Sequence, residues 1–435
     1  MNFNKSEMKR SVVITLVLML VATVVMLYCN DWYNLQGAFE RSKKLFWSMP
    51  FFAVLICICH YHDGKGLTNR EYINKIFPIS ADTKGRKVYL DYARVLAVVL
   101  VIMTHACSAQ QNDMAAVPWK LTLLTICAGI SLVCNPLYVM ISGALLLSSK
   151  KEEKIGRFYF KRFSKIVIPL IIYYMIYLCL SEQVSFIPPR NIGAALKQIL
   201  AGASDTVPHF WMIYVLISLY ISAPFVKVMV RNLNDHQVNA LFVVILVEET
   251  MMVFLPLIGC PIGFGLNLAL WEGVFILGYI ITERRQKWME KLLLVLGGIS
   301  AVVIPLVLLQ DFSYTDYVCN SSPLMVTLSA AVLIVLSKAD SHLKGRLSGL
   351  VQLFSKYSYS LILIHWYGLF GITFTKLYCQ PLRFGCIGGI VLTIMATMIV
   401  CFILGFLADN TIVLVVQKGF EGIGNILVKQ NGEKG

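Results

Sequence analysis

The feature that most constrains this chain is a series of long apolar runs separated by short charged segments. Each run holds about 17–23 residues, which is enough for a helix to cross roughly 30 Å of hydrocarbon. The runs do not alternate apolar with polar residues, as the strands of a membrane barrel would. Backbone hydrogen bonds in lipid must then be satisfied within helices. The sequence therefore predicts an all-α polytopic membrane protein.

Composition agrees with this fold class, and the spacing of the runs gives the number of helices. Hydrophobic residues make up 57% of the 435 residues and charged residues 14%. Soluble proteins are typically about one quarter charged. We expect about twelve transmembrane helices, at 11–29, 44–60, 89–107, 122–147, 166–180, 209–226, 238–257, 265–282, 292–309, 322–337, 357–375 and 386–408.

The expected helices divide the chain into four parts. Residues 1–60 form an N-terminal two-helix membrane unit, and residues 61–87 form a cytoplasmic linker. A ten-helix core follows at 88–408, and residues 409–435 form a cytoplasmic tail. His60 and His62 lie where the first helix pair ends, and we expect them at the membrane interface.

The net charge of +14 is distributed unevenly between the two sides of the membrane. If the N-terminus is inside, 29 of the 38 lysine and arginine residues fall in inner segments and 8 in outer segments, and Arg94 lies within a span. This asymmetry is typical of a plasma-membrane protein. We therefore expect both termini to be cytoplasmic and the basic segments to attract anionic membrane lipid. Nucleic-acid binding is not expected.

Two side chains that are costly in lipid lie in the run "VYLDYARVLAVVLVIMTHA", residues 88–106. Arg94 and His105 are eleven residues apart, which is three helical turns plus 20°, so both point to the same side of a helix about 16 Å apart. Asp91, three residues before Arg94, can pair with it. Ionisable residues within a span usually face the bundle interior or a cavity. The alternative is that Arg94 snorkels to the inner headgroups and His105 lies at the interface.

This spacing of arginine and histidine in one helix resembles the signature of the membrane acyltransferase-3 family. Further segments resemble the family in the same order along the chain. They are "PLYVMISGALLL" (136–147) with Ser142 and Gly143, "RFYFKRFSKIVIPL" (157–170), "HFWMIYVLISLYISAPF" (209–225), "GVFILGYII" (273–281) and "SYSLILIHW" (358–366) with His365. The resemblance covers roughly residues 88–408.

The resemblance implies a ten-helix core that moves an acyl group, commonly acetyl, from acetyl-CoA or another acyl-CoA to sugars and other cell-surface acceptors. No metal is expected. His105 is expected to be catalytic, as a base or as an acyl carrier, because an imidazole with a pKa of roughly 6.5 suits proton transfer near neutral pH. Arg94 is expected to share in catalysis. The expected coenzyme-binding residues are Arg94, Ser142, Arg157, Lys161 and Arg162, since arginine and lysine bind phosphate groups. For the last three residues the alternative is the ordinary positive charge of a cytoplasmic loop.

Several other polar or aromatic side chains within the spans are expected to face the acceptor or to support the site. Buried carboxylates in a membrane indicate function by default, and one of them could orient His105. The alternatives are a structural carboxylate pair, a protonated carboxylic acid, and an aromatic belt for the tryptophan. The residues concerned are Asp91, Glu248, Glu249, Glu272, Trp211 and His365.

Three functions are compatible with these residues. The leading hypothesis is a membrane O-acyltransferase that takes an acyl group, with acetyl expected, from cytoplasmic acyl-CoA to a hydroxyl of a cell-surface glycan or a lipid-linked saccharide. A proton-coupled transporter or flippase of a polar or lipid-linked sugar is the alternative, because buried Arg, His and Glu residues also form proton relays. A membrane sensor or binding module is a third possibility. The sequence leaves the oligomeric state open.

Overall fold

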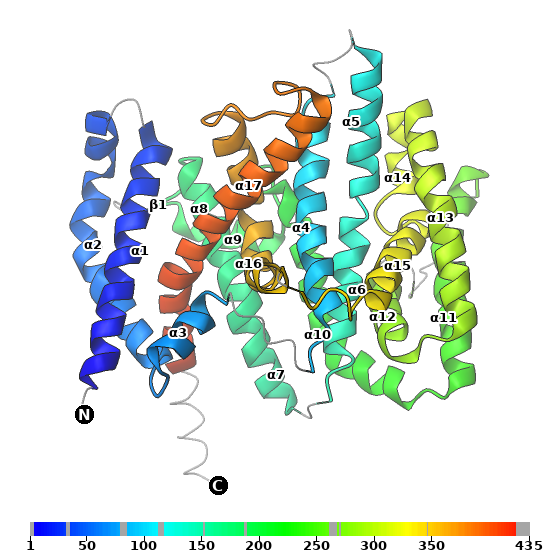
Figure 1. Ribbon diagram of the computed structural model, residues 1–435, viewed down its shortest axis with the longest axis horizontal. Coiled ribbons are helices and arrows are strands. Elements are labelled where there is room, and N and C mark those ends of the chain that lie inside the picture. The colour runs from blue at the N-terminus through cyan, green and yellow to red at the C-terminus, as the bar shows by residue number, and fades with distance from the viewer. Residues whose placement is uncertain are drawn as a thin grey trace. The chain divides into compact units, whose positions relative to one another are not determined.

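The computed structural model describes residues 4–422 apart from 32–34, 79–84, 112–116, 151–152, 187–188, 261–267, 269–270 and 346 (Figure 1). The described residues are mostly helical, and the two strands among them, β1 (Ser185–Phe186) and β2 (Pro189–Arg190), pair antiparallel. Within the described chain, 8 helices are long and apolar enough to cross a membrane. The predicted class of an all-α polytopic membrane protein is therefore confirmed.

The other predicted spans also coincide with helices. The 44–60 run lies on α2 (Leu35–Asp63), the 322–337 run on α15 (Pro323–Lys338), and the 357–375 run on α16 (Ser348–Trp366) followed by η6 (Tyr367–Phe374). The run at 265–282 ends on α12 (Trp271–Tyr279) and η4 (Ile280–Arg284), and most of its first residues lie outside the described part. The total of twelve spans stays a prediction.

Two compact units divide the chain, and both are discontinuous in sequence. Unit 1 combines residues 1–80, 156–210 and 401–435, and unit 2 combines residues 81–155 and 211–400. The four expected domains follow the order of apolar runs, whereas the units follow packing, and the predicted domain boundaries stay a prediction. The predicted linker at 61–87 holds a helix of its own, α3 (Asn69–Ile76).

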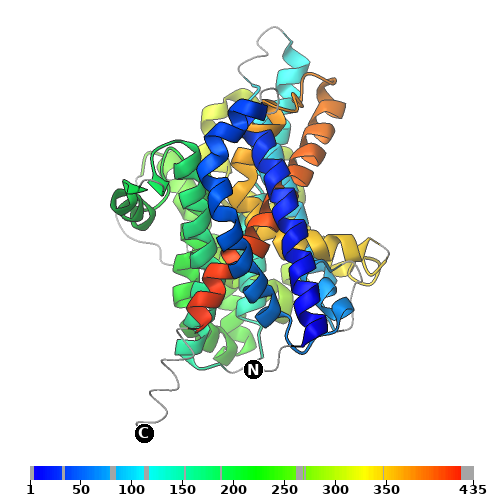
Figure 2. The ribbon, with the colours of Figure 1, turned by 90° about the vertical axis from the view of Figure 1, so that its left-hand side faces the viewer.

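Unit 1 holds the helices before the linker, the α7–α9 region and the end of the chain. Its long first helix, α1 (Lys5–Asp31), packs beside α2, as Figure 2 shows. The described helix at the chain end continues to Gly422. The remaining elements of unit 1 are α7 (Ile155–Arg162), η2 (Phe163–Val167), α8 (Ile168–Leu180), α9 (Ile192–Ala201), η3 (Pro208–Phe210) and η7 (Asp409–Val413).

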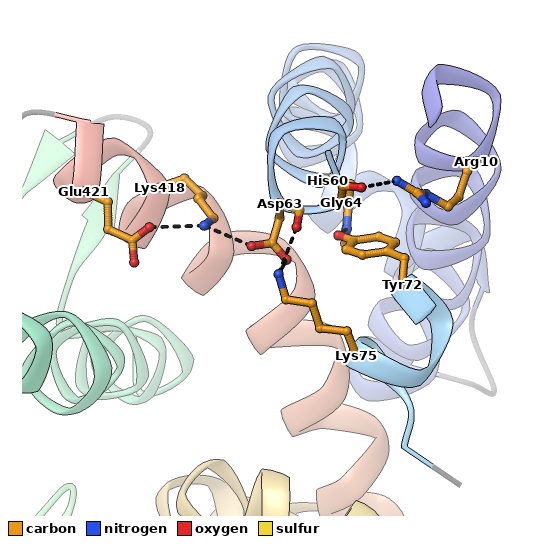
Figure 3. Close-up of polar contacts among 8 residues, drawn as sticks. All are labelled: Arg10, His60, Asp63, Gly64, Tyr72, Lys75, Lys418 and Glu421. Atoms are coloured by element: carbon orange, nitrogen blue, oxygen red, sulfur yellow. Dashed lines mark hydrogen bonds and ion pairs between the residues drawn. The ribbon is translucent and has the colours of Figure 1, made fainter. Parts of the chain in front are cut away.

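Helix α3 begins at a capping box and is fixed to α1 and α2 by buried polar contacts. The Thr68 side chain accepts from the Glu71 backbone N–H, and the Glu71 carboxylate accepts from the Thr68 backbone in return. Arg10 of α1 donates to the carbonyl oxygens of Gly64 and Leu67, at 2.7 Å each, and its guanidinium lies 4.6 Å from the Tyr72 ring centroid (Figure 3). Arg10 thus binds two carbonyl oxygens of the turn between α2 and α3.

His60 is fully buried within the protein, and its expected position at the membrane interface stays a prediction. Its Nε2 lies 3.0 Å from the carbonyl oxygen of Asn410, and its Nδ1 lies 2.8 Å from the Tyr72 hydroxyl. A carbonyl oxygen only accepts, so Nε2 carries the hydrogen and Nδ1 of a neutral ring accepts from Tyr72. His60 therefore joins α2 to α3 and to the end of the chain. His62 is exposed.

Unit 2 contains the described helices of residues 81–155 and 211–400. Its first helix is α4 (Val88–Ser108), which packs on α5 (Pro118–Ser131), α6 (Cys134–Leu146), α15 and α16. The boundary between the units falls within α17 (Cys386–Ala408). The other elements of unit 2 are α10 (Trp211–Asn232), α11 (Asp235–Leu257), α12, η4, α13 (Lys287–Gln310), η5 (Phe312–Tyr314) and α14 (Thr315–Val318).

The predicted 122–147 span is interrupted, because α5 ends at Ser131 and α6 begins at Cys134. Pro136 stands in the first turn of α6, where its missing N–H costs nothing. The Ser329 hydroxyl of α15 donates to the carbonyl oxygen of Val133 in this interruption, at 3.1 Å. Gly143 packs against the backbone of Phe275, so a larger residue there would force α6 away from α12. The Ser-Gly segment of the sequence thus allows close packing of these two helices.

Candidate functional site

The side chains of Arg94 and His105 both face α16. Arg94 Nη1 lies 3.4 Å from the Ser355 hydroxyl near the start of α16. The His105 ring stacks on the ring of His365 near the end of α16, with centroids 5.2 Å apart and planes inclined by 23°. Eleven residues of α-helix place the two side chains about 16 Å apart along α4. Helix α16 therefore contacts both ends of this face of α4.

At the Arg94 end, the carboxylate of Asp91 is the centre of a polar cluster. Asp91 is buried and accepts from Arg86 Nε at 2.6 Å and from Arg86 Nη2 at 2.8 Å, a two-point ion pair. It also accepts from the Ser355 hydroxyl at 2.7 Å. Arg94 Nη1 is 3.7 Å from the Asp91 carboxylate. The pairing of Asp91 with Arg94 that the spacing suggested is thus the longer of two, and Arg86 is the main partner.

The geometry leaves Arg94 only weakly engaged by the protein. Its side chain is 28% exposed, and its contacts with Asp91 and Ser355 are both long. The Tyr138 hydroxyl of α6 is hydrogen-bonded to Ser358 and is close enough to Arg94 to interact with its charge. A guanidinium has five N–H donors. Most of the binding capacity of Arg94 therefore remains for an anionic ligand.

Ser142 lies on the same helix as Tyr138. Its hydroxyl donates to the Tyr138 carbonyl oxygen at 3.0 Å and is 3.4 Å from the hydroxyl of Tyr220 on α10. The side chain is buried. Ser142 thus ties α6 to α10, and a coenzyme would reach its hydroxyl only by replacing one of these contacts.

At the His105 end, the site is aromatic. His105 is half-buried, and the Trp366 ring meets it edge-on with centroids 5.2 Å apart. His365 is buried and its Nδ1 lies 2.6 Å from the carbonyl oxygen of Ile362. Because a carbonyl oxygen only accepts, Nδ1 of His365 carries the hydrogen and Nε2 is the basic nitrogen of a neutral ring. The stacked pair thus combines one half-buried imidazole with one whose orientation the backbone fixes.

The three glutamates contact another side of unit 2. Glu272 accepts from the Ser222 hydroxyl of α10, at 3.1 and 3.4 Å. Glu248 of α11 accepts from the backbone N–H of Leu268, at 2.8 Å, and Glu249 is buried. Glu272 thus joins α12 to α10, and Glu248 joins α11 to the residues before α12, whereas the ring contacts of His105 are with α16.

The remaining predicted residues lie in two places. Arg157, Lys161 and Arg162 belong to α7 in unit 1, where Arg157 and Lys161 are exposed and the guanidinium of Arg162 lies 5.2 Å from the Phe158 ring centroid. Trp211 begins α10 in unit 2, and its ring lies 5.7 Å from that of Trp271, centroid to centroid. Among the described residues, no group of three or more His, Cys, Asp or Glu side chains is arranged to hold a metal ion.

Sequence reasoning missed Arg86 and Ser355. Arg86 precedes the first turn of α4, so helical periodicity does not relate it to Asp91. The run "KGRK" at 84–87 was the available signal, because a basic cluster directly before a buried acidic residue predicts an ion pair. Ser355 lies 264 residues beyond Asp91, and no local pattern connects the two.

Comparison with known proteins agrees with the resemblance in the sequence. The profile of an acyltransferase domain, that of the acyltransferase-3 family, matches residues 87–406 and so covers well over half of the chain. Searches of curated proteins and of solved structures each gave no match. The matched range contains Asp91, Arg94, His105 and His365, the residues that α4 and α16 bring together. The chain therefore belongs to the acyltransferase-3 family and is a membrane acyltransferase.

Proposed function

We propose that this acyltransferase moves an acyl group, acetyl in the first instance, from cytoplasmic acyl-CoA to a hydroxyl of a cell-surface glycan or lipid-linked saccharide. The proposal places the protein in the plasma membrane with both termini in the cytoplasm, as the distribution of basic residues suggests. The observation that carries it is the common face of α4, where Arg94 and His105 both contact α16. The group proposed to bind phosphate and the group proposed to accept a proton thus lie along one helix.

In this proposal Arg94 binds the phosphate groups of the coenzyme at the cytoplasmic end of α4. Its support is the long contact with Asp91, whose charge is already compensated by Arg86. Charge-assisted hydrogen bonds from guanidinium to phosphate are among the strong ones in proteins. Arg157, Lys161 and Arg162 are proposed to add positive charge for the same ligand. Ser142 is proposed to line the coenzyme site. Acyl-CoA and anionic lipid are the proposed negatively charged partners.

His105 is proposed to act where the acceptor hydroxyl meets the thioester. The imidazole takes the proton of the hydroxyl, and the hydroxyl oxygen forms a bond to the carbonyl carbon of the acyl group. The carbon–sulfur bond then breaks, and the CoA thiolate leaves with the proton returned by the imidazolium. Transfer through an acylated His105 would give the same net reaction in two steps. The His365 ring, fixed by the Ile362 carbonyl, holds the His105 ring in place.

The test is His105→Ala in membranes supplied with radiolabelled acetyl-CoA. We expect transfer to membrane saccharides to fall about 10²- to 10⁴-fold, the usual contribution of a general base. Acetyl-CoA binding should change little, because Arg94 lies three turns away. His236→Ala, an exposed histidine at the start of α11, is the matched control and should transfer normally.

Two outcomes would contradict the proposal. Retained transfer in His105→Ala would remove His105 from the reaction. Movement of a saccharide across the membrane without release of free CoA would identify a transporter or flippase instead. Mass spectrometry of surface glycans from cells with and without the protein identifies the acceptor and the acyl group together.

A further inference from the structure

A cavity of about 290 Å³ lies in unit 2, at the end where α10, α12 and α15 begin and α11 ends. Its walls include Trp211 of α10, Trp271 of α12, and Met252 and Val253 of α11. The turn before α15 contributes Asn320 and Ser321. The volume is near the lower limit of ligand pockets, roughly 300 Å³, and suits one ring-sized group. No residue of this lining takes part in the Arg94 cluster or the histidine stack described above.

The lining determines the chemistry that the cavity can bind. Two indole rings lie 5.7 Å apart between centroids and are inclined by 50°, so they form two differently oriented aromatic walls. Trp211 is 37% exposed, so a ligand can reach it. No Lys, Arg, Asp, Glu or His residue lines the cavity in the described part of the unit. The cavity therefore suits a neutral ligand with an apolar face, and it does not suit the phosphates of a coenzyme.

The polar wall comes from the turn at 319–322. Asn320 adopts a left-handed backbone conformation (φ 57°), which asparagine tolerates better than most residues. Its Oδ1 accepts from Asn135 Nδ2 at 3.5 Å, a long contact that leaves its NH₂ group for a ligand. The Ser322 side chain caps α15 by accepting from the Met325 N–H. Asn320 and Ser321 thus supply an amide and a hydroxyl beside the indole rings.

We infer that this cavity binds one neutral pyranose unit of the acceptor. One face of a pyranose ring presents C–H bonds, whose partial positive charge is attracted to the negative face of an indole ring. The hydroxyls at the ring edge would meet Asn320 and Ser321. Asn135 joins the cavity to the start of α6, which packs on α4. The inference rests on the proposed function, because it names the acceptor side of the same reaction.

The experiment measures the binding of methyl pyranosides to the full chain in nanodiscs by saturation-transfer NMR. The probes are the methyl pyranosides of glucose, galactose, mannose and N-acetylglucosamine. We expect at least one of the four to bind, and Trp271→Ala to weaken its binding about tenfold or more, as loss of a central aromatic anchor does. Trp271→Phe should keep part of the binding, because it keeps an aromatic face. Trp119→Ala, an exposed tryptophan of α5, should bind as the natural chain does.

The outcomes separate this inference from the proposed function. If His105→Ala binds the pyranoside normally but does not transfer, both stand. If the natural chain transfers no acyl group yet binds the pyranoside through Trp271, the function fails and the pyranose site stands. The inference is overturned if none of the four pyranosides binds, or if Trp271→Ala binds the pyranoside as well as the natural chain does.

Discussion

Each unit of the protein holds an aspartate contacted by two basic side chains, but the two clusters share their charge differently. In unit 1, Asp63 is 2.8 Å from Lys75 and 2.9 Å from Lys418, and Lys418 is also 3.1 Å from Glu421 (Figure 3). Two carboxylates thus meet two ammonium groups, all at short distance. In unit 2, Asp91 has one short ion pair with Arg86 and one long pair with Arg94.

The difference supports the proposal that the Asp63 cluster is structural and that the Asp91 cluster binds a ligand. The lysines around Asp63 are compensated by protein carboxylates and join α2 and α3 to the end of the chain. Around Asp91, one carboxylate meets two guanidinium groups, so one positive charge is in excess, and it is the charge of the partly exposed Arg94. An uncompensated cation within a helix bundle is costly unless a ligand supplies the anion. The arrangement at Arg94 therefore supports the proposed binding of an anionic substrate.

The largest expected effect separates Arg94 from the lysines of unit 1. Arg94→Gln should weaken acetyl-CoA binding about 30-fold, or about 2 kcal/mol, because it removes charge-assisted hydrogen bonds to phosphate. Arg94→Lys should recover part of the loss, since it keeps the charge but not the two-point geometry. Isothermal titration of the protein in nanodiscs measures both.

Lys75→Gln is the matched control, because it removes one positive charge from the Asp63 cluster. Its acetyl-CoA affinity should equal that of the natural chain. If Arg94→Gln left the affinity unchanged, the excess charge at Asp91 would have no role in coenzyme binding. If Lys75→Gln weakened acetyl-CoA binding equally, the coenzyme would be attracted by the basic charge of the protein in general and not by Arg94 in particular.

A smaller effect compares the two aspartates as contributors to stability. Asp91→Asn should lower the free energy of unfolding by about 2 kcal/mol, because Asp91 accepts three short hydrogen bonds while its side chain is 3% exposed. Asp63→Asn should cost about 1 kcal/mol, since its side chain is 16% exposed and both lysines can return to water.

Thermal unfolding in detergent measures the stability of both aspartate variants, and isothermal titration with acetyl-CoA adds a second contrast. Asp63→Asn should keep the acetyl-CoA affinity of the natural chain. Asp91→Asn should raise it, because it removes a carboxylate charge that lies 3.7 Å from Arg94 and opposes an anionic ligand there. Equal losses of stability in the two variants would contradict the assignment of the two clusters. So would an acetyl-CoA affinity that changes in Asp63→Asn alone.

The sequence predicted the parts of this molecule that depend on local periodicity. Length and apolarity placed the spans, and an eleven-residue spacing placed Arg94 and His105 on one face of α4. Contacts outside a helical repeat were not predictable in this way. Arg86 precedes α4, and the buried position of His60 depends on Asn410, 350 residues later in the chain. Trp211 was singled out, but the cavity also needs Trp271 and the turn before α15, which only the packing of helices brings together.

The smallest expected effect is the pH dependence of the Asp63 cluster. Burial raises the pKa of the Asp63 carboxyl, but hydrogen bonds from Lys75 and Lys418 outweigh burial and hold the pKa below its ordinary value of 3.8. A carboxyl whose pKa is lowered on folding contributes stability above its unfolded pKa and loses it as the pH falls through the folded pKa. The stability difference between the natural chain and Asp63→Asn should therefore be constant from pH 7 to about pH 5 and shrink below about pH 4. Melting curves of both proteins between pH 7 and pH 3 measure it. A difference that persisted unchanged to pH 3 would mean that the two lysines do not hold the Asp63 carboxylate in its charged form.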